Sequence, residues 1–551
     1  VAEPPRAESF ALRGRHINVT FEPPEQKDSP LQVSEIYTLV FGIETEQPQE
    51  IIAAVSSENA LLYTSNLEQV ILTVQLLGDD FEILSEPQKI IVPRVGKSKN
   101  RARFDFSPKR NGVGVLNAFF LLEGNVIQAV ALRLNVGVGQ SAMDTGVTAG
   151  QTLYDLASLT PRALSLWVEY VGEGFRLNLL QANKSISAFL PLTLTELERI
   201  VADARRALAE IVNFSERGRL PYQQEIEIPA RTNQITLANM AQAGHRLYRA
   251  IFQHPKMNTE GQRIAELLQE IADGESAYIQ IISREMYLPW NILYISEEFE
   301  SAQVEPERLL GMKHIIEHVT LRPDMEFSRE IRAAPQLAVS LNLNSDMDRQ
   351  LRFPFVQNQI NAWNKRREQG NINLITRTRS RELIAALSEL GMPDQIMYFY
   401  CNALVKNVAE GGADASLLQF APGDSVTIQD LRLFAPINIQ LKTHPLVFIN
   451  ANESVELAAQ FYNGLMPYLI AKGARGMIGV EATVPALFAA DYAEKFFDQF
   501  LAGKPLGQLM LDLRREYFFK HNNVLGLLYG LYADADTRIV WEQESAKDNI
   551  R

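Results

Sequence analysis

The sequence contains few of the residues and segments on which several classes of protein depend. Cys401 is its single cysteine in 551 residues, which excludes an internal disulfide and a zinc site built from cysteines. No apolar run approaches the ~20 residues that a membrane-spanning helix needs. The N-terminal segment has no apolar signal-peptide core, so we expect a cytoplasmic protein without a membrane association.

Positive charge is also scarce. Lys and Arg number 53 against 66 Asp and Glu, which gives a formal net charge of −13. Nucleic acids and anionic membrane surfaces are held by clustered basic side chains, so this balance argues against both as partners. The hydrophobic fraction of 46% and the charged fraction of 22% are those of a globular protein, and the length allows roughly three domains.

Residues 1–137 have the pattern of an all-β domain. Short runs rich in β-branched and aromatic residues are separated by Pro, Gly, Asn and Asp, which predicts an immunoglobulin-like β-sandwich. These runs are "HINVTFEP", "YTLVFGIE", "QVILTVQLLG", "RARFDFSP" and "LNAFFLLEG". Residues 138–150 are small, polar and rich in Gly, which predicts a linker between two parts that fold separately.

Strands and helices are mixed in the rest of the chain. Residues 151–330 begin with an expected hairpin, "LSLWVEY" followed by "GFRLNLL", and continue with three amphipathic helices. Thr193 and Glu196 form a capping-box pattern before the first of these helices. Residues 331–545 alternate between strand and helix, which predicts a mainly parallel sheet covered by helices on both faces.

Two apolar runs in this last part end in asparagine. They read "QIMYFYC" (395–401) and "PLVFI" (445–449), and each is typical of a strand covered on both faces in a parallel sheet. Asn402 follows the first run, and Asn452 lies just beyond the second. Ligands and chemistry gather beyond the carboxyl ends of such strands, so these two asparagines mark the candidate site.

The segments "YFYCNA" and "LVFINANES" resemble the two catalytic segments of the CHAT peptidases, a caspase-like family related to separase. In that family the first segment usually reads tyrosine-cysteine-histidine-glycine and the second asparagine-alanine-cysteine-glutamate-serine. The resemblance therefore places the general base at Asn402 and the nucleophile at Asn452. The segment "LPWNILY" also resembles an element of the family, with Asn291 in place of the usual glutamate.

The resemblance covers roughly residues 160–540, and the sandwich lies outside it. It implies an α/β caspase-like fold, in which 151–330 is a non-catalytic first half and 331–545 is the CHAT α/β domain. Glu453 follows the nucleophile position, in a segment whose backbone amides help to build the oxyanion site of the family. Glu481 follows the next strand, at a rim where it would hold a basic side chain of a substrate; the alternative is a carboxylate near a helix N-terminus.

Two asparagines cannot perform cysteine peptidase chemistry, which needs an ionisable sulfur and an imidazole to accept its proton. An amide has no titration in the useful range. Cys401 adjoins the base position, but neighbouring strand residues point to opposite faces, so we expect it to be buried and inert. His314 and His318 are four residues apart, but no third ligand follows at a recognisable spacing. We therefore expect neither a metal nor a cofactor.

These observations favour a degenerate CHAT peptidase, or pseudopeptidase, that acts as a regulatory or scaffold protein. Its expected partners are proteins or peptides, such as an active peptidase or its substrate. The resemblance implies a setting in prokaryotic defence or signalling. The alternative is an active caspase-like cysteine endopeptidase whose dyad is misplaced here or was removed by engineering. A nucleotide-binding domain is disfavoured because no Gly-rich loop follows the first strand of the sheet, at "LNLNSDMDRQ".

Overall fold

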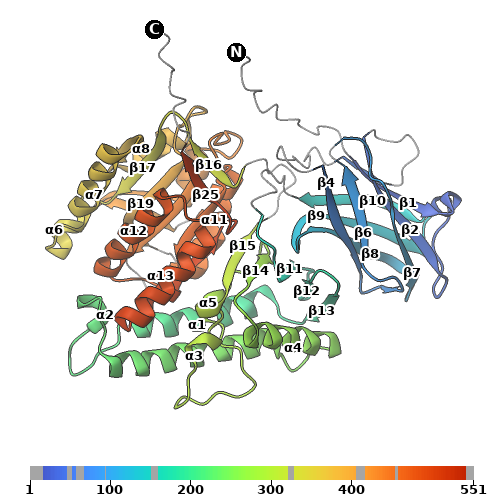
Figure 1. The fold of residues 1–551 in the computed structure, drawn as a ribbon, viewed down its shortest axis with the longest axis horizontal. Coiled ribbons are helices and arrows are strands. Elements are labelled where there is room, and N and C mark those ends of the chain that lie inside the picture. Colours follow the sequence, from blue (N-terminus) through green and yellow to red (C-terminus); the bar gives the residue numbers. More distant parts are fainter. Residues whose placement is uncertain are drawn as a thin grey trace, which may run out of the picture.

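Two antiparallel sheets form the N-terminal part of the chain in the computed structural model (Figure 1). The structure describes residues 16–45, 53–56, 68–93, 95–150, 159–320, 328–404, 416–452 and 457–541. The first sheet contains, in spatial order, β3 (Ala53–Ser56), β1 (His16–Glu22), β2 (Tyr37–Glu44), β7 (Ala102–Pro108) and β5 (Phe81–Ile83). The second contains β10 (Met143–Gly150), β9 (Asn125–Val136), β8 (Gly112–Leu122), β4 (Gln69–Leu77) and β6 (Gln88–Pro93).

The two sheets share one apolar core, to which alternate residues of their strands contribute. Phe41 of the first sheet lies edge-on both to Phe104 of the same sheet and to Phe120 of the second sheet. The predicted β-sandwich is therefore confirmed, and its immunoglobulin-like type stays a prediction.

The predicted linker at 138–150 is wrong in its second part. Residues Met143–Gly150 form β10, which pairs antiparallel with β9, for example with Val147 opposite Ala131. Gly and Ala are poor strand formers, but β10 also contains Val147 and Thr148, whose branched side chains suit a strand. Pairing with the long strand β9 therefore outweighed the composition of this segment, which predicts a linker.

The first half of the remaining chain contains a third sheet, which is mixed. Its order is β13 (Ser185–Leu190), β12 (Phe175–Leu180), β11 (Leu164–Tyr170), β14 (Tyr278–Ile282) and β15 (Ile315–Val319). The predicted hairpin is confirmed, since β11 and β12 pair antiparallel, whereas β11, β14 and β15 run parallel. The helices of this half are α1 (Leu194–Val212), α2 (Pro221–Gln224), α3 (Ala230–Phe252), α4 (Thr259–Asp273) and α5 (Leu310–Lys313). The capping box of Thr193 and Glu196 begins α1, as predicted.

The second half is built on the larger sheet. Its main order is β18 (Ile372–Arg377), β17 (Leu337–Leu343), β19 (Ile396–Leu404), β22 (Leu446–Asn452), β23 (Gly476–Val480) and β24 (Tyr529–Tyr532). All these pairs are parallel except the last, β23 with β24. The hairpin of β20 (Leu417–Ala421) and β21 (Asp424–Thr427) extends from β19. A small parallel pair joins β16 (Glu330–Ala333) to β25 (Arg538–Trp541).

Helices cover both faces of the larger sheet, as the strand and helix alternation predicts. Tyr398 and Phe448 face a core built with α7 (Phe355–Gln369), α12 (Ala486–Leu501) and α13 (Leu506–His521). The alternate residues Phe399 and Ile449 face the other core, with α8 (Ser380–Leu387), α10 (Ile428–Phe434) and α11 (Leu457–Ala471). The short helix α6 (Met347–Leu351) follows β17. No helix among the described residues is long and apolar enough to cross a membrane.

The three parts of the chain are packed against one another. The first core of the large sheet also contains side chains from α1 and α3, such as Leu208 and Met240. A further apolar cluster joins Phe119 and Leu121 of the sandwich to Trp167 and Ile282 of the first half. Hydrogen bonds cross the same junction, where Arg162 N donates to Glu123 O at 2.8 Å. The sandwich is thus docked on the first half.

Gly124 makes this close approach possible. It lies in the turn between β8 and β9 with φ of 75°, a conformation that favours glycine, and its carbonyl accepts a hydrogen bond from Ser165 Oγ at 2.8 Å. A Cβ atom at this position would lie 2.0 Å from Arg162 O. Any side chain here would therefore push the sandwich away from the first half.

Candidate functional site

The structure brings the two candidate asparagines together. Strands β19 and β22 run parallel in a register that sets Ile396 beside Leu446 and ends with Asn402 beside Asn452. The sequence predicted that both strands end at the same edge of the sheet, and this is confirmed. The assignment of the two residues as degenerate base and nucleophile positions stays a prediction.

Asn402 is enclosed rather than open to solvent. Its exposed fraction is 3%, and the hairpin strand β20 pairs antiparallel with β19 so that Gln419 lies opposite Asn402. The Asn402 Nδ2 donates a long hydrogen bond of 3.4 Å to Gln419 Oε1. An amide held by another amide offers neither a base nor an acid, so this position cannot take up a proton near neutral pH.

Cys401 is not placed to act as a nucleophile. Its side chain is fully buried in the core that contains Phe399 and Ile449, on the face of the sheet opposite to Tyr400. Burial raises the pKa of its thiol to about 12, and a thiol that stays protonated at neutral pH is a poor nucleophile. The predicted inward orientation of Cys401 is confirmed.

None of the histidines that the structure describes lies at this strand edge. His444 lies at the opposite end of β22, where its Nδ1 is 2.8 Å from Gly473 O. His314 and His318, which are four residues apart in the sequence, do not share a helix, because His314 follows α5 and His318 belongs to β15. Among the described residues, no group of three or more His, Cys, Asp or Glu side chains is arranged to hold a metal ion.

The predicted position of Glu481 on an open rim is also wrong. Glu481 follows β23, but only 1% of it is exposed, and Arg205 of α1 binds its Oε2 through Nη2 at 2.8 Å and Nε at 3.2 Å. Tyr532 donates a hydrogen bond to its Oε1. Burial raises the pKa of this carboxyl, and Arg205 opposes that shift. The alternative is not supported either, because Glu481 precedes α12 without joining its first turn. Glu453 lies outside the described residues.

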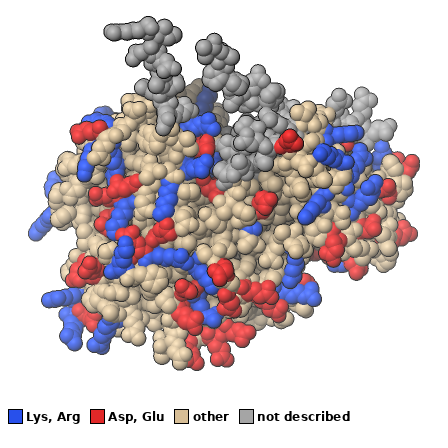
Figure 2. Space-filling model, in the orientation of Figure 1, with Lys and Arg blue, Asp and Glu red and all other residues tan. Residues whose placement is uncertain are grey.

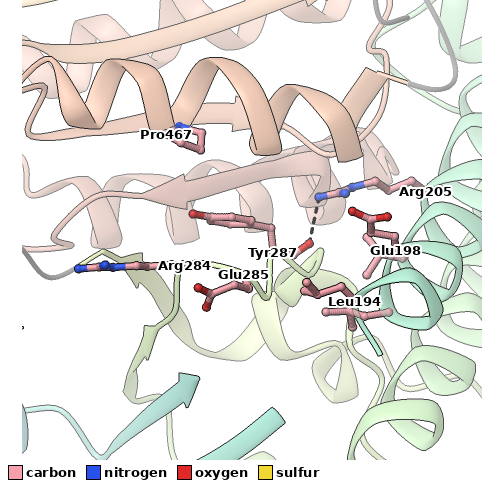
Figure 3. A pocket seen from close by; sticks show the side chains of 9 residues that line it. Leu194, Glu198, Arg205, Arg284, Glu285, Tyr287 and Pro467 are labelled. Atoms are coloured by element: carbon pink, nitrogen blue, oxygen red, sulfur yellow. Dashed lines mark hydrogen bonds between the residues drawn. The ribbon is translucent and has the colours of Figure 1, made fainter. Parts of the chain in front are cut away.

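The pair of Glu481 and Arg205 belongs to a chain of contacts between the two halves. Tyr532 lies beside His318, with ring centroids 5.4 Å apart, and His318 stacks on Tyr287 at 4.9 Å. Arg205 Nη2 in turn donates to Tyr287 O at 3.3 Å (Figure 3), so the contacts lead from Glu481 through Tyr532, His318 and Tyr287 back to Arg205. No sequence pattern links these five residues, so their association could not be found without the fold.

Arg205 and Tyr287 also line a pocket of about 250 Å³. Its wall is formed by α1, by the segment 284–287 and by Pro467 of α11, so it lies between the first and second halves (Figure 3). The lining residues are Leu194, Leu197, Glu198, Val201, Arg205, Arg284, Glu285, Tyr287 and Pro467. Neither candidate asparagine lines it, and sequence reasoning did not identify it.

Asn291, in the segment "LPWNILY", contacts a buried arginine. Arg514 Nη1 donates to Asn291 Oδ1 at 2.8 Å, and Asn291 Nδ2 donates to Tyr529 O at 2.7 Å. Burial lowers the pKa of Arg514 to about 10. The neighbouring Trp290 packs in the core of the first half, as expected.

The sequence model of the CHAT domain matches residues 242–518. The chain belongs to the CHAT domain family. The match begins within α3 and ends within α13, so it includes both strands that carry the candidate asparagines and excludes the sandwich. The resemblance seen in the sequence is thereby confirmed, over a shorter stretch than roughly 160–540.

Two further similarities are more limited. A protein of Vitiosangium sp. (strain GDMCC 1.1324) named "Probable protease" is 30% identical over 178 residues, which cover 30% of this chain and 21% of that protein. A crystal structure of the Saccharomyces cerevisiae separase–securin complex matches 68% of this CHAT chain and 30% of the other, with 9% identity and a TM-score of 0.36. This chain therefore spans less than a third of either protein.

The buried side chain of His318 is expected to make the protein less stable in acid. Burial lowers the pKa of His318 to about 4, against about 6.5 in an unfolded chain. Between these values the unfolded state binds more protons, so stability is complete above pH ~6.5 and is lost as the pH falls toward ~4. From pH 7 to pH 5 we expect His318 to contribute a loss of about 2 kcal/mol in unfolding free energy.

Urea unfolding at both pH values, on the wild type and on His318→Phe, measures this contribution. The variant keeps an aromatic ring against Tyr287 and removes the titrating group. Its stability is expected to fall less between pH 7 and pH 5. An unchanged pH dependence in the variant would show that His318 is not the group responsible.

Proposed function

We propose that this CHAT protein is a catalytically inactive peptidase homologue that binds a protein or peptide partner as a regulatory or scaffold component. The register that sets Asn402 beside Asn452 at the carboxyl ends of β19 and β22 carries the proposal. The prokaryotic defence or signalling setting rests on the family resemblance alone.

The chemistry of the described residues supports inactivity. The base position holds an enclosed amide, and the nearest thiol faces a closed core on the other side of the sheet. Loss of a nucleophile or base lowers kcat on the order of a million-fold in another class of peptidase. Absence of both groups leaves, among the described residues at this edge of the sheet, no thiol or imidazole that a small movement could recruit.

Free strand edges support a binding role. Among the described residues, β18 and β24 end the main strand order of the large sheet, and β21 ends the hairpin that extends from β19, so each of these strands pairs with one neighbour. An extended polypeptide can add to such an edge through main-chain hydrogen bonds, which require no catalytic side chain. A partner could therefore be held without being cleaved.

The test is cleavage of a peptide library by the purified full chain, with and without thiol reductant. We expect no turnover above buffer, from the wild type or from Cys401→Ala, while an unrelated active cysteine peptidase cleaves in the same assay. Turnover that disappears in Cys401→Ala, or in Asn402→Ala with Asn452→Ala, would support the alternative of an active peptidase. That result would overturn the proposed inactivity.

A further inference from the structure

Strand β18 ends the large sheet with part of its backbone unpaired. Just before this strand, Leu337 N of β17 donates to Asn371 O at 2.8 Å. The peptide groups of alternate residues point to opposite edges of a strand, so the odd-numbered residues of β18 face β17, and Leu374 and Thr376 face outward. No turn or loop among the described residues bonds to the backbone of these two residues. They therefore offer free N–H and C=O groups.

This edge lacks the features that usually keep another chain from adding to it. Proteins protect a free edge strand with charged side chains, proline or a bulge. The central residues of β18 read "NLIT", and their pairing with β17 runs without a shift of register. Asn373 and Thr376 are exposed. The other strands with one neighbour suit docking less well, because β24 is buried along its whole length and β21 has four residues.

Basic side chains surround this edge in a chain that is acidic as a whole. Residues 365–381, which include the end of α7, all of β18 and the start of α8, contain six basic residues and one acidic residue, Glu368. Two of the six, Arg366 and Arg377, already pair with aspartates. The other four are exposed and form no ion pair with another described residue; they are Lys365, Arg367, Arg379 and Arg381.

The surface charge selects an anionic partner, and the strand edge selects a polypeptide. Figure 2 shows basic side chains along the left margin of the molecule, where α7 and α8 lie in Figure 1. Such a patch attracts anionic chains and speeds their association. A nucleic acid matches the charge, but its backbone has no alternating N–H and C=O groups to pair with Leu374 and Thr376.

We propose that β18 binds an acidic, extended segment of a partner polypeptide, which adds to the large sheet as a further strand. Main-chain hydrogen bonds join this segment to Leu374 and Thr376, and its carboxylates pair with Arg367 before the strand and Arg379 after it. The inference rests on the proposed binding role, to which it gives a place in the fold and a partner chemistry.

A designed peptide tests this edge without knowledge of the partner. The probe alternates glutamate and valine, carries fluorescein, and is about seven residues long to match the six residues of β18. Fluorescence anisotropy with the full chain should show saturable binding. The same peptide with alternate amides N-methylated, and a peptide with lysine in place of glutamate, should each bind at least tenfold more weakly, because one loses its main-chain donors and the other its charge.

Variants of the chain locate the binding. Thr376→Pro removes one outward N–H, which an edge strand tolerates, and should weaken the probe at least tenfold. Its matched control, Thr376→Val, keeps that N–H and should bind as the wild type does. Arg367→Gln with Arg379→Gln should weaken the probe about threefold or more, whereas Arg263→Gln, an exposed position on α4, should leave its affinity unchanged.

Equal binding of the acidic and N-methylated peptides would overturn the proposal, and this comparison decides even if Thr376→Pro fails to fold. Binding of single-stranded oligothymidylate without binding of the acidic peptide would overturn it in favour of a nucleic acid. The mass of the recovered probe tests the proposed inactivity separately. A cleaved probe would overturn inactivity alone, and an intact probe that does not bind would overturn this inference alone.

Discussion

Replacement of Arg162 by methionine is expected to lower the free energy of unfolding by about 3–5 kcal/mol, because it leaves buried carboxylates without their cation. The Arg162 side chain is fully buried, and its Nη2 is 2.8 Å from Glu317 Oε2 while its Nη1 is 2.9 Å from Asp536 Oδ2. Asp534 Oδ1 lies 3.6 Å from the same guanidinium. Burial alone would lower the pKa of Arg162, but these three carboxylates raise it above its ordinary value.

The loss of stability is expected to affect all three parts of the chain, because Arg162 and its three carboxylate partners join them. Gln280 Nε2 of β14 donates to Glu317 Oε1 at 2.8 Å, and Gln280 Oε1 accepts from Val126 N of the sandwich at 3.1 Å. Asp534 and Asp536 follow β24 of the large sheet. Arg162 is thus the cation at a junction of the sandwich and both halves.

Urea unfolding followed by tryptophan fluorescence measures the effect. The matched control is Arg263→Met, which breaks an exposed i,i+3 pair with Glu260 on α4 and should cost about 1 kcal/mol or less. If Arg162→Met is no more destabilising than Arg263→Met, the buried cluster does not hold the parts together.

Arg205→Met is expected to have an effect of similar size for a related reason. It leaves the buried carboxylate of Glu481 with Tyr532 as its remaining side-chain partner, at an expected loss of about 3–5 kcal/mol in unfolding free energy. The second change Glu481→Gln should recover most of this loss, because an amide oxygen can still accept from Tyr532 and no charge remains buried.

The double-mutant cycle of Arg205→Met and Glu481→Gln gives the coupling energy of the pair. Arg206→Met is the control on the same helix, since Arg206 is exposed and pairs with Asp203 within α1. Additive effects of the two buried changes would show that the pair is not coupled across the halves. The cycle also tests whether Glu481 is engaged inside the molecule and not free at a substrate rim.

Much of the fold could be predicted from the sequence, because the decisive patterns were local. Apolar runs at 395–401 and 445–449 marked two buried parallel strands, and their common end at Asn402 and Asn452 followed from strand direction. The capping box at Thr193 likewise depends on residues three apart. The error at 138–150 arose because pairing with β9 outweighed a composition typical of linkers.

The sequence by itself determined what the strand ends cannot do, since an asparagine at 402 or 452 has no ionisable group in any fold. It also determined the family, through short segments around these positions. Only the tertiary structure decided which distant charges meet. Arg162 finds Glu317 and Asp536, and Arg205 finds Glu481, across 155 to 374 residues of chain. Such pairs have no characteristic separation in the sequence, because the packing of whole elements brings the two residues together. The strength of each pair depends on the exclusion of water that this packing brings.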